Sequence, residues 1–156
     1  MIEQVTVSDI IWESTKEIFE TMIFLPVEKP ETSEIEISST SLICTITFTG
    51  QIQGSFSILC SLEVVEKIAR AMLMIEEDPL DDSEISDAFG ELANMVIGGI
   101  KSRLSETFAD FQISIPAVTM GMEIQPILNK GMERVDFAAN ADGQPMKMSM
   151  MFKKMD

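Results

Sequence analysis

The sequence contains no histidine. This absence excludes Ser–His and Cys–His nucleophile pairs, imidazole metal ligands and the usual general base near neutral pH. Only two cysteines occur, Cys44 and Cys60, and each lies in a run of alternating apolar residues. That setting is typical of reduced core thiols rather than of a disulfide framework, although a pairing across adjacent strands stays open. Much of ordinary hydrolase chemistry is therefore closed to this chain.

Basic residues and long apolar runs are also scarce. Lys and Arg number 11 against 26 Asp and Glu, which gives a formal net charge of −15, and no basic patch is larger than Lys153-Lys154. This balance disfavours nucleic acid and anionic lipid as partners, and it indicates solubility or attraction to a basic partner surface. No run approaches about 18 apolar residues, and residues 1–6 lack the features of a signal peptide. We therefore expect a cytoplasmic protein with no membrane partner.

What the chain has instead is enough apolar material for one core. Its 156 residues are 46% hydrophobic, which predicts a single domain over residues 1–156. Alternating apolar residues over 42–60 and 135–152 predict two β-hairpins, the second closed by the tight-turn dipeptide Asp142-Gly143. The other periodic stretches predict a helix over 8–24 with Ser8 as N-cap, whose core face carries Ile11, Thr15, Ile18, Met22 and Leu25. They also predict a short extended piece over 34–38, a helix after a Ser61 cap, a long helix from Asp82 or Ser83 to about Thr107, and an extended segment with Pro116.

The order of these elements repeats. Helix, proline-bearing connection and paired strands occur twice along the chain, which suggests an internal duplication of about 75 residues with almost no shared identities. Both long helices must bury an apolar stripe, and each hairpin offers one apolar face. The sequence therefore predicts an α+β fold of two layers, with long helices packed on a mostly antiparallel sheet built from pseudo-duplicated helix-strand-strand halves.

The long helix carries polar residues on the face opposite its core. At an advance of about 100° per residue, four residues fall within roughly 60° of one another and form what we call the polar stripe: Asp87, Glu91, Asn94 and Gly98. The opposite side has the apolar spacing of a buried face: Ile85, Phe89, Leu92, Val96 and Ile100. An asparagine inside a helix competes for backbone bonds, and a glycine there costs about 1 kcal/mol against Ala. The polar stripe is thus either a functional face or an ordinary solvated one.

The polar stripe and a following proline resemble the motif of the CheC/CheX/FliY family of chemotaxis phosphatases, and the likeness is closest to its CheX branch. The family pattern is an Asp or Ser, three residues, Glu, two residues, Asn, and then a little over twenty residues to a Pro. Here it is Asp87, Glu91, Asn94 and Pro116, with 21 residues between the last two, about one fewer than the family's usual spacing. The order of elements resembles a CheC-like fold over essentially the whole chain.

The resemblance implies a protein aspartyl-phosphate phosphatase that acts on a phosphorylated CheY-like response regulator. The substrate is an aspartyl phosphate already held by the regulator's own Mg²⁺ and lysine, so the phosphatase needs no cofactor or metal of its own and supplies chiefly a positioned water. An amide offers one acceptor and two donors for that water. Asn94 and Glu91 are then the catalytic residues, Asn94 positioning the water while Glu91 pairs with a regulator lysine. Asp87 and Gly98 join Glu91 in partner binding.

The first helix carries no second copy of the motif, since it has Glu13-x-x-Lys16 and Glu17-x-x-Glu20, and no Asn precedes position 94. One site per chain is typical of CheX-like members, and the resemblance implies a homodimer. The methionines of the last strand could cap an edge by pairing with a second copy, or simply fill the core.

Two other functions remain open from the residues. The first is a non-catalytic module that binds receiver domains, related to flagellar-switch proteins. The second is a metal site built from Asp81, Asp82 and Glu84, although carboxylates at a helix N-terminus are also favoured by the helix dipole.

Overall fold

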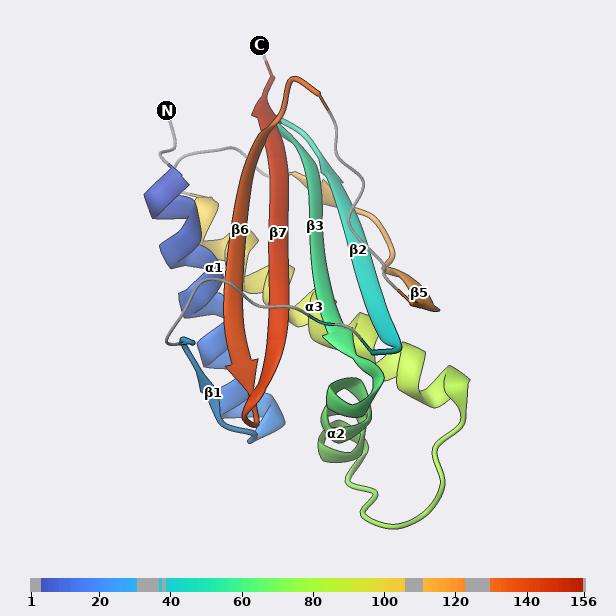
Figure 1. The fold of residues 1–156 in the computed structure, drawn as a ribbon. Coiled ribbons are helices and arrows are strands. Elements are labelled where there is room, and N and C mark those ends of the chain that lie inside the picture. The colour runs from blue at the N-terminus through green and yellow to red at the C-terminus, as the bar shows by residue number, and fades with distance from the viewer. Residues whose placement is uncertain (1–3, 31–36, 38, 106–110, 123–129, 156) are drawn as a thin grey trace.

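The protein consists of helices packed against one antiparallel sheet (Figure 1). The computed structural model describes residues 4–30, 37, 39–105, 111–122 and 130–155. The sheet has seven strands in the order β1-β6-β7-β3-β2-β4, and β5 also pairs with β2. The elements are α1 (Gln4–Ile18), the π-helix η1 (Phe19–Ile23), β1 (Val27–Glu28), β2 (Ser41–Thr49), β3 (Ile52–Ser61), α2 (Leu62–Leu73), α3 (Asp82–Leu104), β4 (Gln112–Ile113), β5 (Ala117–Gly121), β6 (Glu133–Ala141) and β7 (Gln144–Lys154).

Helices α1 and α3 cover one face of the sheet, and α2 follows directly from the end of β3 (Figure 1). Along the long strands, the apolar side chains at alternating positions point toward these helices and are buried. The Thr15 hydroxyl of α1, for example, contacts Met148 Sδ of β7 at 3.2 Å. The strand residues of this core are Leu42, Cys44, Ile46, Phe48, Ile52, Phe56, Ile58, Cys60, Val135, Ala139, Ala141, Met146, Met148, Met150 and Phe152. The predicted two-layer α+β fold is confirmed.

The two predicted hairpins form and meet at the centre of the sheet, where β3 pairs with β7. The turn between β6 and β7 places Asp142 and Gly143 at φ 50° and 81°, the left-handed pair that a two-residue hairpin turn requires. Each half also lends a short strand to the other: β1, which follows α1, pairs with β6, and β5, which follows α3, pairs with β2. This reciprocal exchange agrees with the suggested duplication.

The N-terminal helix differs from its prediction. It begins at Gln4, so Ser8 lies inside α1 and is not its N-cap. After Ile18 the chain continues as a π-helix, whose wider turn rotates the apolar face. Phe19 and Ile23 are therefore buried, whereas Met22, predicted on the core face, is 54% exposed. The extended piece predicted over 34–38 lies outside the described residues, apart from Ile37, which is in no strand, and Ser61 caps α2 as expected through a bond from Val64 N–H.

Both cysteines are buried free thiols. Burial raises the pKa of Cys44 to about 12 and also raises the pKa of Cys60. In the register of β2 and β3 Cys44 lies opposite Ile58, and Cys60 lies opposite Leu42. The prediction of reduced core thiols is confirmed, and the alternative of a cross-strand pairing is wrong. Among the described helices, none has the length and apolar character needed to cross a membrane.

Leu92 and Val96 test which face of α3 is buried. Both are fully buried, so we expect Leu92→Ala and Val96→Ala to lower the free energy of unfolding by roughly 1 to 5 kcal/mol each through lost core volume. Denaturant melts measure this, with Leu73→Ala, the same truncation at a 43% exposed leucine of α2, as the matched control. Neutral melts for both α3 variants would contradict the face assignment.

Candidate functional site

Helix α3 starts with a reciprocal cap that explains its N-terminal carboxylates. The Asp81 side chain accepts a hydrogen bond from Glu84 N–H at 2.8 Å, and the Glu84 carboxylate accepts one from Asp81 N–H at 3.2 Å. These two bonds satisfy backbone donors that have no partner within the helix. Across the described ranges, no group of three or more His, Cys, Asp or Glu side chains is placed to hold a metal ion. Asp81 and Glu84 therefore have a structural role as the cap of α3, and the metal alternative is without support.

The two faces of α3 are divided as predicted. All five apolar residues opposite the polar stripe are buried. Of the stripe itself, Asp87, Glu91 and Gly98 are exposed and Asn94 is half-buried. The structure thus brings the four predicted site residues together on one accessible helix face.

Asn94 and Glu91 are not held by any other described residue. No hydrogen bond or ion pair of either side chain occurs within the described part of the chain. Every buried side-chain nitrogen and oxygen of the described residues does have a hydrogen-bond partner, so the unbonded Asn94 amide must reach solvent despite its partial burial. An amide in this position is available to bind something outside the chain.

Pro116, the last residue of the predicted motif, packs against α3 beside the polar stripe. A Cβ added at Gly90 would lie 3.1 Å from Pro116 Cγ and 4.0 Å from Val118 Cγ2 of β5. Gly90 and Asn94 are four residues apart and hence neighbours on the helix surface. The contact therefore sets Pro116 and β5 along the Asn94 side of the stripe.

Helix α1 borders α3 on the other side. A Cβ at Gly99 would lie 3.1 Å from Ser14 Cβ of α1, so the glycine allows the two helices to approach closely. The Arg103 guanidinium donates to Ser14 Oγ at 3.3 Å and to the Gly99 carbonyl at 3.2 Å. It also pairs with Glu17 at 3.1 Å. The polar stripe thus lies between α1 and β5 on a helix held from both sides.

Gly98 differs from the other two glycines because a Cβ there would meet nothing within 4 Å. Its small size serves no packing inside the chain and leaves open space at the stripe. Helical spacing placed Gly98 on the polar stripe, but it gave no indication that Gly90 and Gly99 are packing contacts. A glycine inside a helix costs stability wherever it occurs, and only the tertiary structure shows which of the three is required by a neighbour.

The chemistry available on this face is limited. It offers one amide, two carboxylates and space, with no histidine, no thiol and no metal cluster among the described residues. Such a face can bind a basic surface through its carboxylates and orient a water molecule through the amide, and its described residues include no histidine or thiol that could serve as base or nucleophile.

Comparison with known proteins decides the family. The family model described as chemotaxis phosphatase CheX matches residues 42–138, a range that contains the whole polar stripe and Pro116. The chain belongs to the CheX family.

Individual relatives agree with this assignment. The CheY-P phosphatase CheX of Thermotoga maritima is 36% identical over 99 residues, which cover 62% of this chain and 63% of the relative's length. A crystal structure of the chemotaxis protein CheX from Vibrio vulnificus has a TM-score of 0.80 at 22% identity, covering 98% of this chain and all of that one. The CheX–CheY–BeF₃–Mg²⁺ complex from Borrelia burgdorferi gives 0.76 at 20% identity, with 99% and 100% covered. These structures share the fold described above.

Proposed function

We propose that this chain dephosphorylates a phosphorylated CheY-like response regulator in the cytoplasm, and that the polar stripe of α3 docks on the regulator. The observation that carries the proposal is the half-buried Asn94 amide, which has no hydrogen bond within the described part of the chain and lies one turn from the Glu91 carboxylate on a helix packed between α1 and β5. The CheX family and the Thermotoga relative, which is named for CheY-P phosphatase activity, supply the substrate class.

The reaction is the hydrolysis of an aspartyl phosphate on the partner. A water oxygen attacks phosphorus, the bond from phosphorus to the aspartate oxygen breaks, and inorganic phosphate leaves while the carboxylate is restored. Asn94 accepts a hydrogen bond from that water, or donates one to it, and so holds it in line with the breaking bond. The partner's Mg²⁺ and lysine neutralise the phosphoryl charge, so the chain needs no cofactor of its own.

The other stripe residues serve docking. The Glu91 carboxylate pairs with a lysine of the regulator, Asp87 adds negative charge one turn earlier, and Gly98 leaves room for the regulator's active-site loop. The complex of a Borrelia CheX with CheY, BeF₃ and Mg²⁺ supports a receiver domain as the partner and Mg²⁺ as the partner's ion. A homodimer with one site per chain completes the proposal, by analogy with CheX-type proteins.

A non-catalytic receiver-binding module is the competing function. It would use the same stripe without hydrolysis, but such a module has no need of the Asn94 amide beside Glu91. A phosphate-release assay separates the two possibilities: purified chain is added to CheY-like receiver domains of the same organism, phosphorylated with acetyl phosphate. Faster phosphate release supports the phosphatase, whereas tight binding with no change in the rate of release supports the module.

Glu91→Lys is expected to weaken both binding and turnover. It would place a positive charge against the regulator's lysine, and reversing a desolvated interfacial charge commonly costs roughly 2 to 5 kcal/mol. Glu91→Gln keeps the shape without the charge and should do less harm. Titration with a receiver domain held by BeF₃⁻ and Mg²⁺ measures the affinity of each variant. Equal affinities for Glu91→Lys and wild type would contradict the docking role.

A further inference from the structure

The sheet edge beside the polar stripe contains a β-bulge. In the pairing with β2, Ile113 of β4 lies opposite Phe48, and Ala117 of β5 lies opposite Thr45. Two residues of β2 stand between those partners, whereas the edge chain has three, Ser114, Ile115 and Pro116. The edge therefore carries one extra residue. Bulges of this kind bend an edge strand, change the direction of a side chain and occur often next to active sites.

The bulge is held firmly on both sides. Ser114 N–H donates to the Thr47 carbonyl at 2.9 Å, and Thr47 N–H donates to Ser114 Oγ at 2.9 Å. The Ser114 hydroxyl in turn donates to the Ile115 carbonyl at 3.1 Å. On the other side Pro116 has a restricted φ and packs on Gly90 of α3. The Ile115 backbone is thus fixed relative to both β2 and α3.

The Ile115 side chain itself makes little use of this support. It is 87% exposed, and no buried apolar cluster of the described residues includes it. If this position served to protect the edge from unwanted strand pairing, a lysine or another charged residue would be expected there instead of isoleucine. A bulky apolar side chain that stands in solvent on a fixed backbone has instead the properties of an interface anchor, because no backbone has to be ordered when it is buried.

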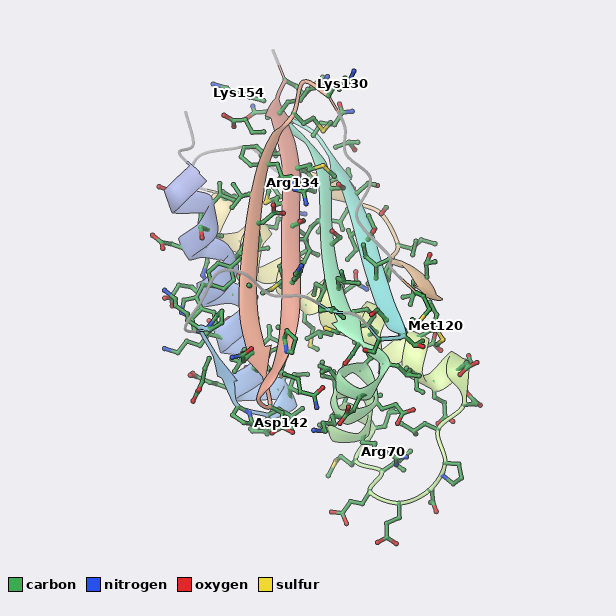
Figure 2. All side chains as sticks on the ribbon, viewed as in Figure 1. Arg70, Met120, Lys130, Arg134, Asp142 and Lys154 are labelled. Atoms are coloured by element: carbon green, nitrogen blue, oxygen red, sulfur yellow. The ribbon has the colours of Figure 1, made fainter. Side chains whose placement is uncertain are left out.

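Ile115 is also next to the polar stripe. It precedes Pro116, which contacts Gly90, and Gly90 lies one turn from Asn94. Farther along β5, Met120 is 39% exposed on the strand face that carries Val118, beside the N-terminal part of α3 (Figure 2). The polar stripe and this apolar edge are neighbours in the fold, so a partner that covers both would offer a basic group beside an apolar patch.

We propose that Ile115 is an apolar anchor that seats the phosphorylated receiver domain beside the polar stripe, burying itself in an apolar patch next to the receiver's lysine. This inference rests on the proposed function and adds to it a second, hydrophobic contact contributed by the sheet edge. Ile115 sets the affinity for the receiver and takes no part in the hydrolysis. Its role is positioning, so its loss raises KM and leaves kcat nearly unchanged.

The test compares Ile115→Ser with wild type in two assays: titration with the CheY-like receiver domain of the same organism bound to BeF₃⁻ and Mg²⁺, and steady-state phosphate release. We expect a roughly tenfold or greater rise in Kd and KM, because the variant lacks the isoleucine side chain that wild type buries in the complex, with kcat changed less than about twofold. Ile115→Leu should restore binding. Met74→Ser is the matched control, because Met74 is 89% exposed at the end of α2 and lies outside this surface.

The outcomes separate the anchor from the proposed function. Unchanged Kd and KM in Ile115→Ser, with Asn94→Ala inactive, would overturn the anchor and leave the phosphatase standing. An equal loss in Met74→Ser would also overturn it, because the effect would then not be local. A wild-type chain that neither binds nor dephosphorylates the receiver would overturn the proposed function and the anchor together. Thermal melts should show the same stability for Ile115→Ser and wild type, since so exposed a side chain contributes little to the core.

Discussion

Asn94→Ala is expected to abolish stimulated dephosphorylation while leaving the fold and receiver binding intact. The amide makes no hydrogen bond within the described part of the chain, so its removal breaks no internal contact. Alanine is also the better helix former, and the change in stability should stay within about 0.5 kcal/mol. Loss of one preorganised polar group that acts only in the transition state lowers kcat by roughly a hundredfold or more.

The measurement combines phosphate release with titration against the BeF₃⁻–Mg²⁺ receiver. Asn140→Ala, the same substitution at a half-buried position of β6, is the control and should keep full activity. Asn94→Ala with normal activity would refute the catalytic assignment. Asn94→Ala with lost binding and normal kcat would move the residue from catalysis to docking.

Gly98→Leu is expected to move stability and activity in opposite directions. A Cβ at this exposed position would meet no atom of the described residues within 4 Å, so leucine can extend into solvent. Replacing a helix glycine should then stabilise α3 by up to about 1 kcal/mol and raise Tm by roughly 2 to 4 °C. The same side chain would occupy the space that the partner's active-site loop needs, and it should block the complex.

Gly98→Ala is the matched control, because it gains most of the helix propensity and adds only one methyl group. We expect it to be more stable than wild type and to retain binding. Thermal melts and receiver titrations of the three proteins provide the comparison. A Gly98→Leu chain that binds and turns over normally would mean that the polar stripe is an ordinary solvated surface.

Local patterns in the sequence were sufficient for much of the fold. The hairpins follow from two-residue alternation, and the Asp142-Gly143 turn follows from the left-handed conformations that these residues tolerate. The division of α3 into a buried and an exposed face follows from the spacing of Leu92 and Val96 against Glu91 and Asn94. Each of these signals acts between residues close in sequence, so no knowledge of packing was required.

The first helix shows where such reasoning failed. The α-helical period placed Met22 on the core face, but the π-turn after Ile18 changed the phase and buried Phe19 and Ile23 instead. A π-turn depends on how the helix end packs on its neighbours rather than on any residue type. The helix start at Gln4 was missed for a related reason, because Ser8 has the chemistry of a cap without occupying the position of one.

The sequence by itself determined the residues of the candidate site: a carboxylate, an amide and a glycine at helical spacing, on a face with no competing core role. Only the tertiary structure decided what surrounds them. Pro116 reaches α3 because Gly90 has no side chain, and Ile115 is exposed because the edge strand has one residue more than β2 opposite it. Both depend on segments distant in sequence meeting at a fixed register. Periodicity within one segment carries no information about that register, because it is set by the packing of the whole sheet against the helices.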